Sequence, residues 1–350
     1  MELSEKDKIL KICQDITRNI PVIILGSGVS MELGMTGMQD LQKIIFDDID
    51  SFDLEQKLKD SLKYNILNYG LEAGLSKTTE IINNEKFLNK IVNIVWDIIY
   101  NKDTEFFKKI LMNDEKIPLE KVLNYYRGKT SKLNIITTNY DRLTEYAVDR
   151  CANFVLYRGF PNSFYSNFNQ DKRLDIRYSS NRASLTKVHL LKVHGSIDWF
   201  EKYGNQVSFN PVYNTSHKKM IITPGLNKHH MAYTEPFRSL MADSDKILKE
   251  SRTFLCIGFG FNDSHVQEHI ERKIKEKDTS IIVIAKKLTD NVFRLFKQSN
   301  TKADFCLLEE GDNTESTKIY LQYKGTSSEY KIDNLKIWNL SGFAKTVLEG

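Results

Sequence analysis

The sequence predicts an α/β fold in which a doubly wound parallel sheet carries a helical insertion. Short, largely apolar runs occur at intervals along the chain, as expected of strands that helices cover on both faces. These runs lie at residues 22–25, 133–137, 188–193, 252–257 and 280–285. Most of them stop at a glycine or polar turn that leads into a helical pattern, which is typical of strand–turn–helix units. Together they predict a Rossmann-like sheet.

Composition and charge exclude several broad classes. The 350 residues leave room for one large domain or two smaller ones. A hydrophobic content of 41% and a charged content of 27% are those of an ordinary soluble protein, and a net charge of +4 does not indicate nucleic-acid binding. Residues 1–11 carry no signal-peptide run, and no segment has the roughly 18 apolar residues of a spanning helix. We therefore expect a cytoplasmic protein without membrane contact.

Cysteine spacing argues against both a four-cysteine zinc site and a disulfide framework. The cysteines are far apart in the sequence and form no Cys-x-x-Cys pair: Cys13, Cys151, Cys256 and Cys306. We expect them to be small buried residues, and we expect no bound metal. His265 and His269 have the i, i+4 spacing of metal ligands, but no Glu-flanked zinc-protease pattern accompanies them. We interpret this pair as part of a partly exposed helix face.

The first apolar run leads directly into a glycine-rich loop, Gly26-Ser27-Gly28-Val29-Ser30. A strand, a glycine turn and the start of a helix together predict a phosphate cradle, in which Gly26 and Gly28 let the backbone approach the ligand. The Rossmann fingerprint would need a third glycine where Met31 stands, and the Walker A lysine is missing. Alone, this loop fits a tight structural turn equally well.

Two stretches depart from the strand–turn–helix pattern. Residues 40–132 carry apolar residues at helical spacing with charged residues between them, and we interpret them as a helical insertion between two strands. The insertion could form the roof of a pocket or an oligomer surface. Phe154–Arg182 is aromatic and polar without a clear period, which indicates a loop or lid.

Polar residues follow three further strands, where open α/β sheets bind ligands. Asn139 and Asp141 follow residues 133–137, and they could bind a ligand or cap the next helix. His194 ends the run 188–193, before the turn that Gly195 permits. A neutral imidazole there can accept a proton near pH 7, although a hydrogen-bonded core or turn histidine is the plainer interpretation.

The run 252–257 leads into a second glycine-rich junction, Gly258-Phe259-Gly260-Phe261-Asn262-Asp263, and a helix follows. Asp263 could accept hydrogen bonds from ribose hydroxyls or cap that helix. The tail after Thr301 alternates around residues 318–323, which predicts a hairpin, and a short last helix is expected at Gly342–Leu348.

Three of these motifs, in this order, resemble the Sir2 (sirtuin) family: Gly26–Ser30, Thr137–Asp141 and His194–Trp199. The loop Gly258–Asp263 fits that family's late nucleotide-binding loop, with Gly258, Gly260 and Asp263 as its candidate binding residues. The resemblance implies NAD+ bound on a Rossmann-like sheet and cleavage of the bond between nicotinamide and ribose. By position, the dinucleotide would be held by Gly26, Ser27, Gly28 and Ser30. Asn139 and Asp141 would hold the nicotinamide ribose and carboxamide, with Asn139 counted among the catalytic residues, and His194 would be the catalytic base.

The departures from the family pattern favour NAD+ hydrolysis over protein deacylation. Deacylating sirtuins usually carry a zinc module with two Cys-x-x-Cys pairs, which this chain lacks, and the sirtuin Thr-Gln-Asn is Thr137-Thr138-Asn139 here. The chain looks closer to the sirtuin-like NAD+-hydrolysing effectors of bacterial antiphage defence. We therefore expect an NAD+ glycohydrolase that releases nicotinamide and ADP-ribose and depletes cellular NAD+. An NAD-dependent protein deacylase and a non-catalytic NAD or ADP-ribose sensor are the alternatives.

The same resemblance sets expectations for domains and partners. We expect residues 1–290 to form the Sir2-like catalytic domain, with residues 291–350 completing it as a C-terminal extension. Because an unrestrained NADase would kill its host, activity must be controlled. We therefore expect a homo-oligomer, and a separately encoded sensor or ATPase as a candidate partner.

Overall fold

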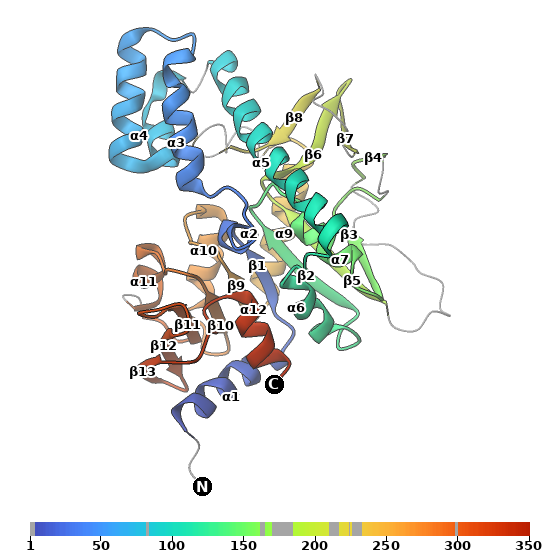
Figure 1. Ribbon diagram of the computed structural model, residues 1–350, viewed down its shortest axis with the longest axis vertical. Coiled ribbons are helices and arrows are strands. Elements are labelled where there is room, and N and C mark those ends of the chain that lie inside the picture. The colour runs from blue at the N-terminus through green and yellow to red at the C-terminus, as the bar shows by residue number, and fades with distance from the viewer. Residues whose placement is uncertain are drawn as a thin grey trace.

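The computed structural model describes residues 4–81, 84–161, 165–169, 185–209, 217–223, 225, 233–297 and 300–350. Its centre is a nine-stranded sheet with the order β13-β12-β11-β10-β9-β1-β2-β5-β3 (Figure 1). The strands from β11 to β3 are parallel, and an antiparallel hairpin, β12–β13, closes one edge. The predicted doubly wound α/β fold is confirmed.

The strand bounds follow the apolar runs of the sequence. One half of the sheet contains β1 (Val22–Leu25), β2 (Lys132–Thr137), β3 (Phe154–Tyr157) and β5 (Thr186–Lys192). The other half contains β9 (Thr253–Ile257), β10 (Ser280–Ile284), β11 (Asp304–Glu310), β12 (Thr317–Tyr323) and β13 (Thr326–Ile332). The chain builds outward from β1 on one side and later returns to its other side at β9. The edge beyond the carboxyl ends of β1, β2 and β9 is therefore a topological switch point, where open α/β sheets bind ligands.

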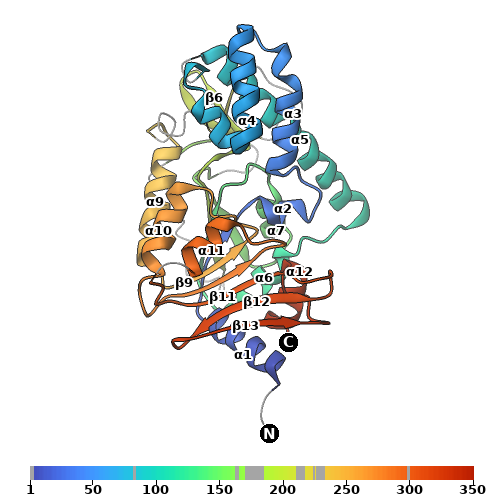
Figure 2. The ribbon, with the colours of Figure 1, turned by 90° about the vertical axis from the view of Figure 1, so that its left-hand side faces the viewer.

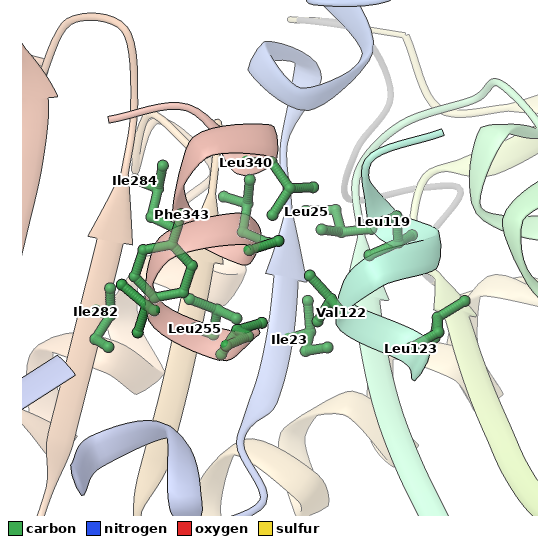
Figure 3. Close-up of a cluster of buried hydrophobic side chains, with 14 of the residues drawn as sticks. Ile23, Leu25, Leu119, Val122, Leu123, Leu255, Ile282, Ile284, Leu340 and Phe343 are labelled. Atoms are coloured by element: carbon green, nitrogen blue, oxygen red, sulfur yellow. The ribbon is translucent and has the colours of Figure 1, made fainter. Parts of the chain in front are cut away.

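Helices cover both faces of this sheet because its strands alternate buried side chains between them. Ile23 and Leu25 point to the face covered by α1 (Glu5–Arg18), α6 (Leu119–Tyr126), α7 (Leu143–Asp149) and α12 (Leu340–Phe343). Figure 3 shows side chains of α6 and α12 packed over Ile23, Leu255 and Ile282. Val22 and Ile24 point to the opposite face, which is covered by α9 (Phe237–Glu250), α10 (Ser264–Lys273) and α11 (Asp290–Lys297). The last helix continues from α12 as a π-helical turn, Ala344–Leu348.

A second, antiparallel sheet has the order β4-β7-β6-β8. It contains β4 (Tyr165–Asn167), β6 (Gly195–Lys202), β7 (Asn205–Phe209) and β8 (Lys218–Ile221). The expectation that Phe154–Arg182 is a loop or lid is therefore wrong in part. β3 extends the large sheet beside β5, and β4 pairs with β7. These strands have four and three residues, which are runs too short to show a period in the sequence. Residues 162–164 and 170–184 of that stretch lie outside the described part.

The connection from β1 to β2 is helical, as the sequence predicted. Its main elements after the short helix α2 (Ser27–Met31) are α3 (Met38–Asp48), α4 (Gln56–Lys77), α5 (Glu85–Asn113) and α6. We call α3 to α5 the helical cap. Its apolar side chains pack on the small sheet, where Trp96 Nε1 donates a hydrogen bond to the carbonyl of Ile197 at 2.9 Å. Figures 1 and 2 show the cap at the end of the molecule opposite the two termini.

Candidate functional site

A cavity of about 630 Å³ lies at the carboxyl edge of the large sheet. Its floor is formed by the loops that follow β1, β2 and β9, and by His194 after β5. Its roof comes from the helical cap. The structure thus brings together nine of the ten site residues predicted from the sequence: Gly26, Ser27, Ser30, Asn139, Asp141, His194, Gly258, Gly260 and Asp263.

Gly28, the tenth, does not line the cavity but joins two of its loops. Its N–H donates to the carbonyl of Gly258 at 3.0 Å. Gly258 has φ 57°, and a Cβ on it would lie 2.3 Å from the backbone nitrogen of Val29. A Cβ on Gly26 would lie 2.4 Å from the Gly258 oxygen. These glycines let the two loops pack backbone to backbone, a role of Gly26 and Gly28 that the sequence did not reveal.

Asn139, Ser30 and Asp141 form a hydrogen-bonded chain on the cavity floor. Asn139 Nδ2 donates to the carbonyl of Gly26 and to Ser30 Oγ, both at 3.0 Å. Ser30 Oγ donates to Asp141 Oδ2 at 2.8 Å. Because both amide hydrogens of Asn139 are donated within the protein, its carbonyl oxygen is the side-chain atom that can serve a ligand. The network fixes the orientation of a polar group at the end of β2.

Asp141 contacts the start of α7 and also lines the cavity. Its Oδ1 accepts a hydrogen bond from the N–H of Leu143 at 3.2 Å, at the start of α7, while the residue also lines the cavity. Burial raises the pKa of this carboxyl to about 6, against the opposing effects of the Lys192 charge and the hydrogen bond from Ser30. Asp141 therefore changes its charge just below neutral pH.

A buried ionic cluster supports this floor from below. The fully buried Lys192 donates through Nζ to Glu145 Oε1 at 3.0 Å and to the carbonyl of Asp141. Next to it, Arg158 lies 2.5 Å from Asp198 and 3.5 Å from Glu145. Burial opposes ionisation of Asp198, but the positive charges of Arg158 and Lys192 hold the pKa of that carboxyl well below its usual range. Sequence reasoning missed this cluster, although a lysine at the end of an apolar run was a signal for a buried ion pair.

His194 lies against Asp263 across the cavity floor. Its Nε2 is 3.0 Å from Asp263 Oδ2, and both side chains are about nine-tenths buried. Asp263 Oδ1 accepts from the N–H of Val266 at 3.1 Å, which caps α10. Gly195 has φ 87°, so the chain turns sharply after His194, as expected, and enters β6 directly. The capping role proposed for Asp263 is confirmed, and its pairing with His194 is new.

The helical cap contributes cavity residues that the sequence did not reveal. α3 supplies Met38, Leu41 and Gln42, and α4 supplies residues 69–73. At Gly70, φ 81° and ψ 172° interrupt the helix, and Gln42 Oε1 accepts from the N–H of Leu71 at 2.9 Å. The break exposes one turn of α4 to the cavity. Of the two roles that the sequence analysis considered for the insertion, this geometry supports a roof.

The candidate metal ligands His265 and His269 do not line the cavity. His265 and His269 face Asp245 of α9, with Nε2 to Oδ1 distances of 3.0 and 2.9 Å. Within the described ranges, no three His, Cys, Asp or Glu residues are arranged to hold a metal ion.

All four cysteines are free and buried, and the sulfur atoms of Cys13 and Cys306 lie 3.7 Å apart. Among the helices that the structure describes, none is long and apolar enough to cross a bilayer.

The chain is similar to known proteins in fold and in sequence. The solved structures that are similar to the chain include the following two. One concerns the mechanism and regulation of Sir2 enzymes, with 12% identity over 83% of this chain and 90% of that one, and a TM-score of 0.42. The other concerns sirtuin substrate affinity, with 11% identity over 100% of this chain and 99% of that one, and a TM-score of 0.43. No curated protein matches.

The family assignment rests on the sequence between β2 and the terminal hairpin. A family model described as the SIR2-like domain matches residues 133–325, which is more than half of the chain. The matched range contains Asn139, Asp141, His194 and the loop Gly258–Asp263, so it includes most of the cavity floor. The chain belongs to the SIR2-like domain family.

Proposed function

We propose that this protein is an NAD+ glycohydrolase that releases nicotinamide and ADP-ribose. The observation that carries the proposal is the joint placement of Asn139, Asp141 and His194 on one cavity floor, beside the glycine loops after β1 and β9. A dinucleotide needs a loop edge that can face its phosphates, an amide oxygen for ribose or carboxamide, and a base near the anomeric carbon. The cavity floor supplies residues of each kind.

Cleavage of the bond between nicotinamide and ribose needs no general acid from the protein. Nicotinamide leaves as a neutral molecule with the electron pair of its bond to ribose C1′, because its ring is already cationic in NAD+. The transition state is oxocarbenium-like, as in glycoside cleavage. Asn139 would position the ribose, and ionised Asp141 would favour the positive charge. His194 would take a proton from water as the water oxygen bonds to C1′.

The cap supports water as the acceptor in this proposal. Residues 69–73 and Gln42 form a roof over the floor. A protein deacylase needs, in addition to the NAD+ site, a channel that admits an acyl-lysine peptide. Water needs no such channel. On this basis we expect NAD+ cleavage that is independent of any acylated peptide. The cysteines are far apart in the sequence, and we therefore expect no zinc requirement.

The biological part of the proposal rests on the motif resemblance. We infer that the enzyme acts as an antiphage defence effector in the cytoplasm and depletes NAD+ on activation. Restraint would come from self-association or from a separately encoded sensor or ATPase. Mass photometry of the chain, alone and with a neighbouring gene product, tests this. A monomer that cleaves NAD+ at full rate at every concentration, with or without that product, contradicts it.

Nicotinamide release from NAD+ is the direct test of the activity. Purified protein is incubated with NAD+, with and without acetylated peptide, and products are separated by chromatography. We expect nicotinamide and ADP-ribose in equal amounts without peptide. Folded His194→Ala and Asn139→Ala variants should each lose most of this activity. Peptide-dependent release would indicate a deacylase, and binding of NAD+ without cleavage would indicate a sensor. Near-normal turnover by folded His194→Ala would refute the assigned base.

A further inference from the structure

Two residues that meet over the cavity floor come from opposite halves of the large sheet. His194 follows β5 and Asp263 follows β9, and these strands lie on either side of β1. The imidazole Nε2 and the carboxylate Oδ2 are 3.0 Å apart, and both residues line the cavity. This contact therefore joins the two halves of the large sheet at the cavity floor.

From this geometry we infer that Asp263 is a positioning residue that sets the tautomer of His194. An ionised carboxylate only accepts hydrogen bonds, so the proton of a neutral imidazole must be on Nε2. Nδ1 is then the acceptor that can take a proton from water or a ribose hydroxyl. The inference rests on the proposed NAD+ cleavage for its catalytic consequence, but the tautomer itself does not depend on it.

Asp263 is itself held in place, as an orienting group must be. Its second oxygen accepts from the N–H of Val266 and so fixes the carboxylate to the first turn of α10. Val266 and Ile270 of that helix are fully buried in the core beside the large sheet. A histidine base that is oriented by a carboxylate, which the fold in turn holds in place, is the arrangement expected of an activated proton acceptor.

Asp263→Asn separates positioning from structure. Asparagine is as good a helix N-cap as aspartate, so the α10 cap and the melting temperature should be retained. Its amide can donate to Nε2, which would move the imidazole proton to Nδ1 and remove the acceptor. We expect kcat to fall on the order of 10²–10⁴-fold with little change in KM, as in a triad whose histidine is held in the wrong tautomer.

The ¹⁵N chemical shifts of His194, assigned by comparison with His194→Ala, report the tautomer directly. We expect the Nε2-protonated form in the native protein and the Nδ1-protonated form in Asp263→Asn. The matched control is Asp245→Asn, which removes a histidine-paired carboxylate outside the cavity and should leave kcat unchanged.

The two proposals fail in distinguishable ways. If the native protein shows the expected tautomer but does not cleave NAD+, the proposed function is wrong and the positioning role of Asp263 for catalysis falls with it, while the tautomer assignment stands. If NAD+ is cleaved and Asp263→Asn keeps native kcat, or the native protein carries the proton on Nδ1, the inference about Asp263 is overturned.

Discussion

Replacing Asp141 with asparagine should make the stability of the protein less dependent on pH. The carboxyl has an ordinary pKa of 3.8, and burial raises it to about 6 in the folded protein. The folded state therefore holds this proton more tightly than the unfolded state. The stabilisation that results is complete below pH 3.8 and is lost as the pH rises through 6. Its full size is about 3 kcal/mol.

Part of this pH-dependent stabilisation falls between pH 5 and pH 8, where the unfolding free energy can be measured. As the pH falls from 8 to 5, linkage predicts that the unfolding free energy of the unsubstituted protein rises by about 1.4 kcal/mol relative to that of Asp141→Asn, because only the unsubstituted protein has this carboxyl to protonate. Urea denaturation of both proteins, followed by tryptophan fluorescence at each pH, gives the difference. Other groups titrate alike in both proteins and cancel. A difference in unfolding free energy that is the same at pH 5 and pH 8 would refute the reasoning.

Asp141 should also give NAD+ cleavage a pH dependence. The nicotinamide ring and the transition state are positively charged, so ionised Asp141 favours both. We expect KM for NAD+ to rise as the pH falls below 6 in the native enzyme, and this rise to be absent in Asp141→Asn. The initial rate of nicotinamide release, measured for both enzymes across pH 5–8, tests both expectations.

Three further substitutions test the packing around the site. Arg158→Met leaves Asp198 buried without its partner and should cost about 3–5 kcal/mol of unfolding free energy, part of which a second change, Asp198→Asn, should restore. Gly258→Ala should lower the unfolding free energy by about 1–3 kcal/mol, because its Cβ would collide with the first glycine loop. It should also weaken NAD+ binding, measured by calorimetry. Gly128→Ala is the control for backbone strain, because Gly128 has φ 73° and open space around it. Gly70→Ala should shift the roof and raise KM more than it lowers kcat; an unchanged KM would show that this turn of α4 does not contact substrate.

The parts predicted well from the sequence are those in which local pattern and tertiary burial agree. Residues 22–25 and 254–257 are apolar because helices cover both faces of their strands, and this requires no knowledge of partners. Asn139 and His194 could be placed at one edge because parallel strands that cross over through helices share a direction. The periodicity of residues 40–132 gave helices for the same local reason.

The parts missed depend on contacts between distant residues. Nothing local to Asp263 points to His194, because capping already explains an aspartate before a helix. The roof residues Gln42 and Tyr69 have no motif, and their role comes from the break at Gly70 and from how the cap is seated. Short strands such as β4 gain stability only from a neighbouring strand, so a period over three residues cannot reveal them.

β6 links the base to the roof. It begins at Gly195, directly after His194, whose carbonyl accepts from the N–H of Ile222 at 2.9 Å at the end of β8. Two residues further along β6, Ile197 accepts the hydrogen bond from Trp96 of the cap and belongs to the same apolar cluster. Because buried side chains are close-packed, the seating of the cap on β6 and the position of His194 constrain each other. The insertion is thus tied to the candidate site through the strand that follows His194, as well as through the side chains that it places over the cavity.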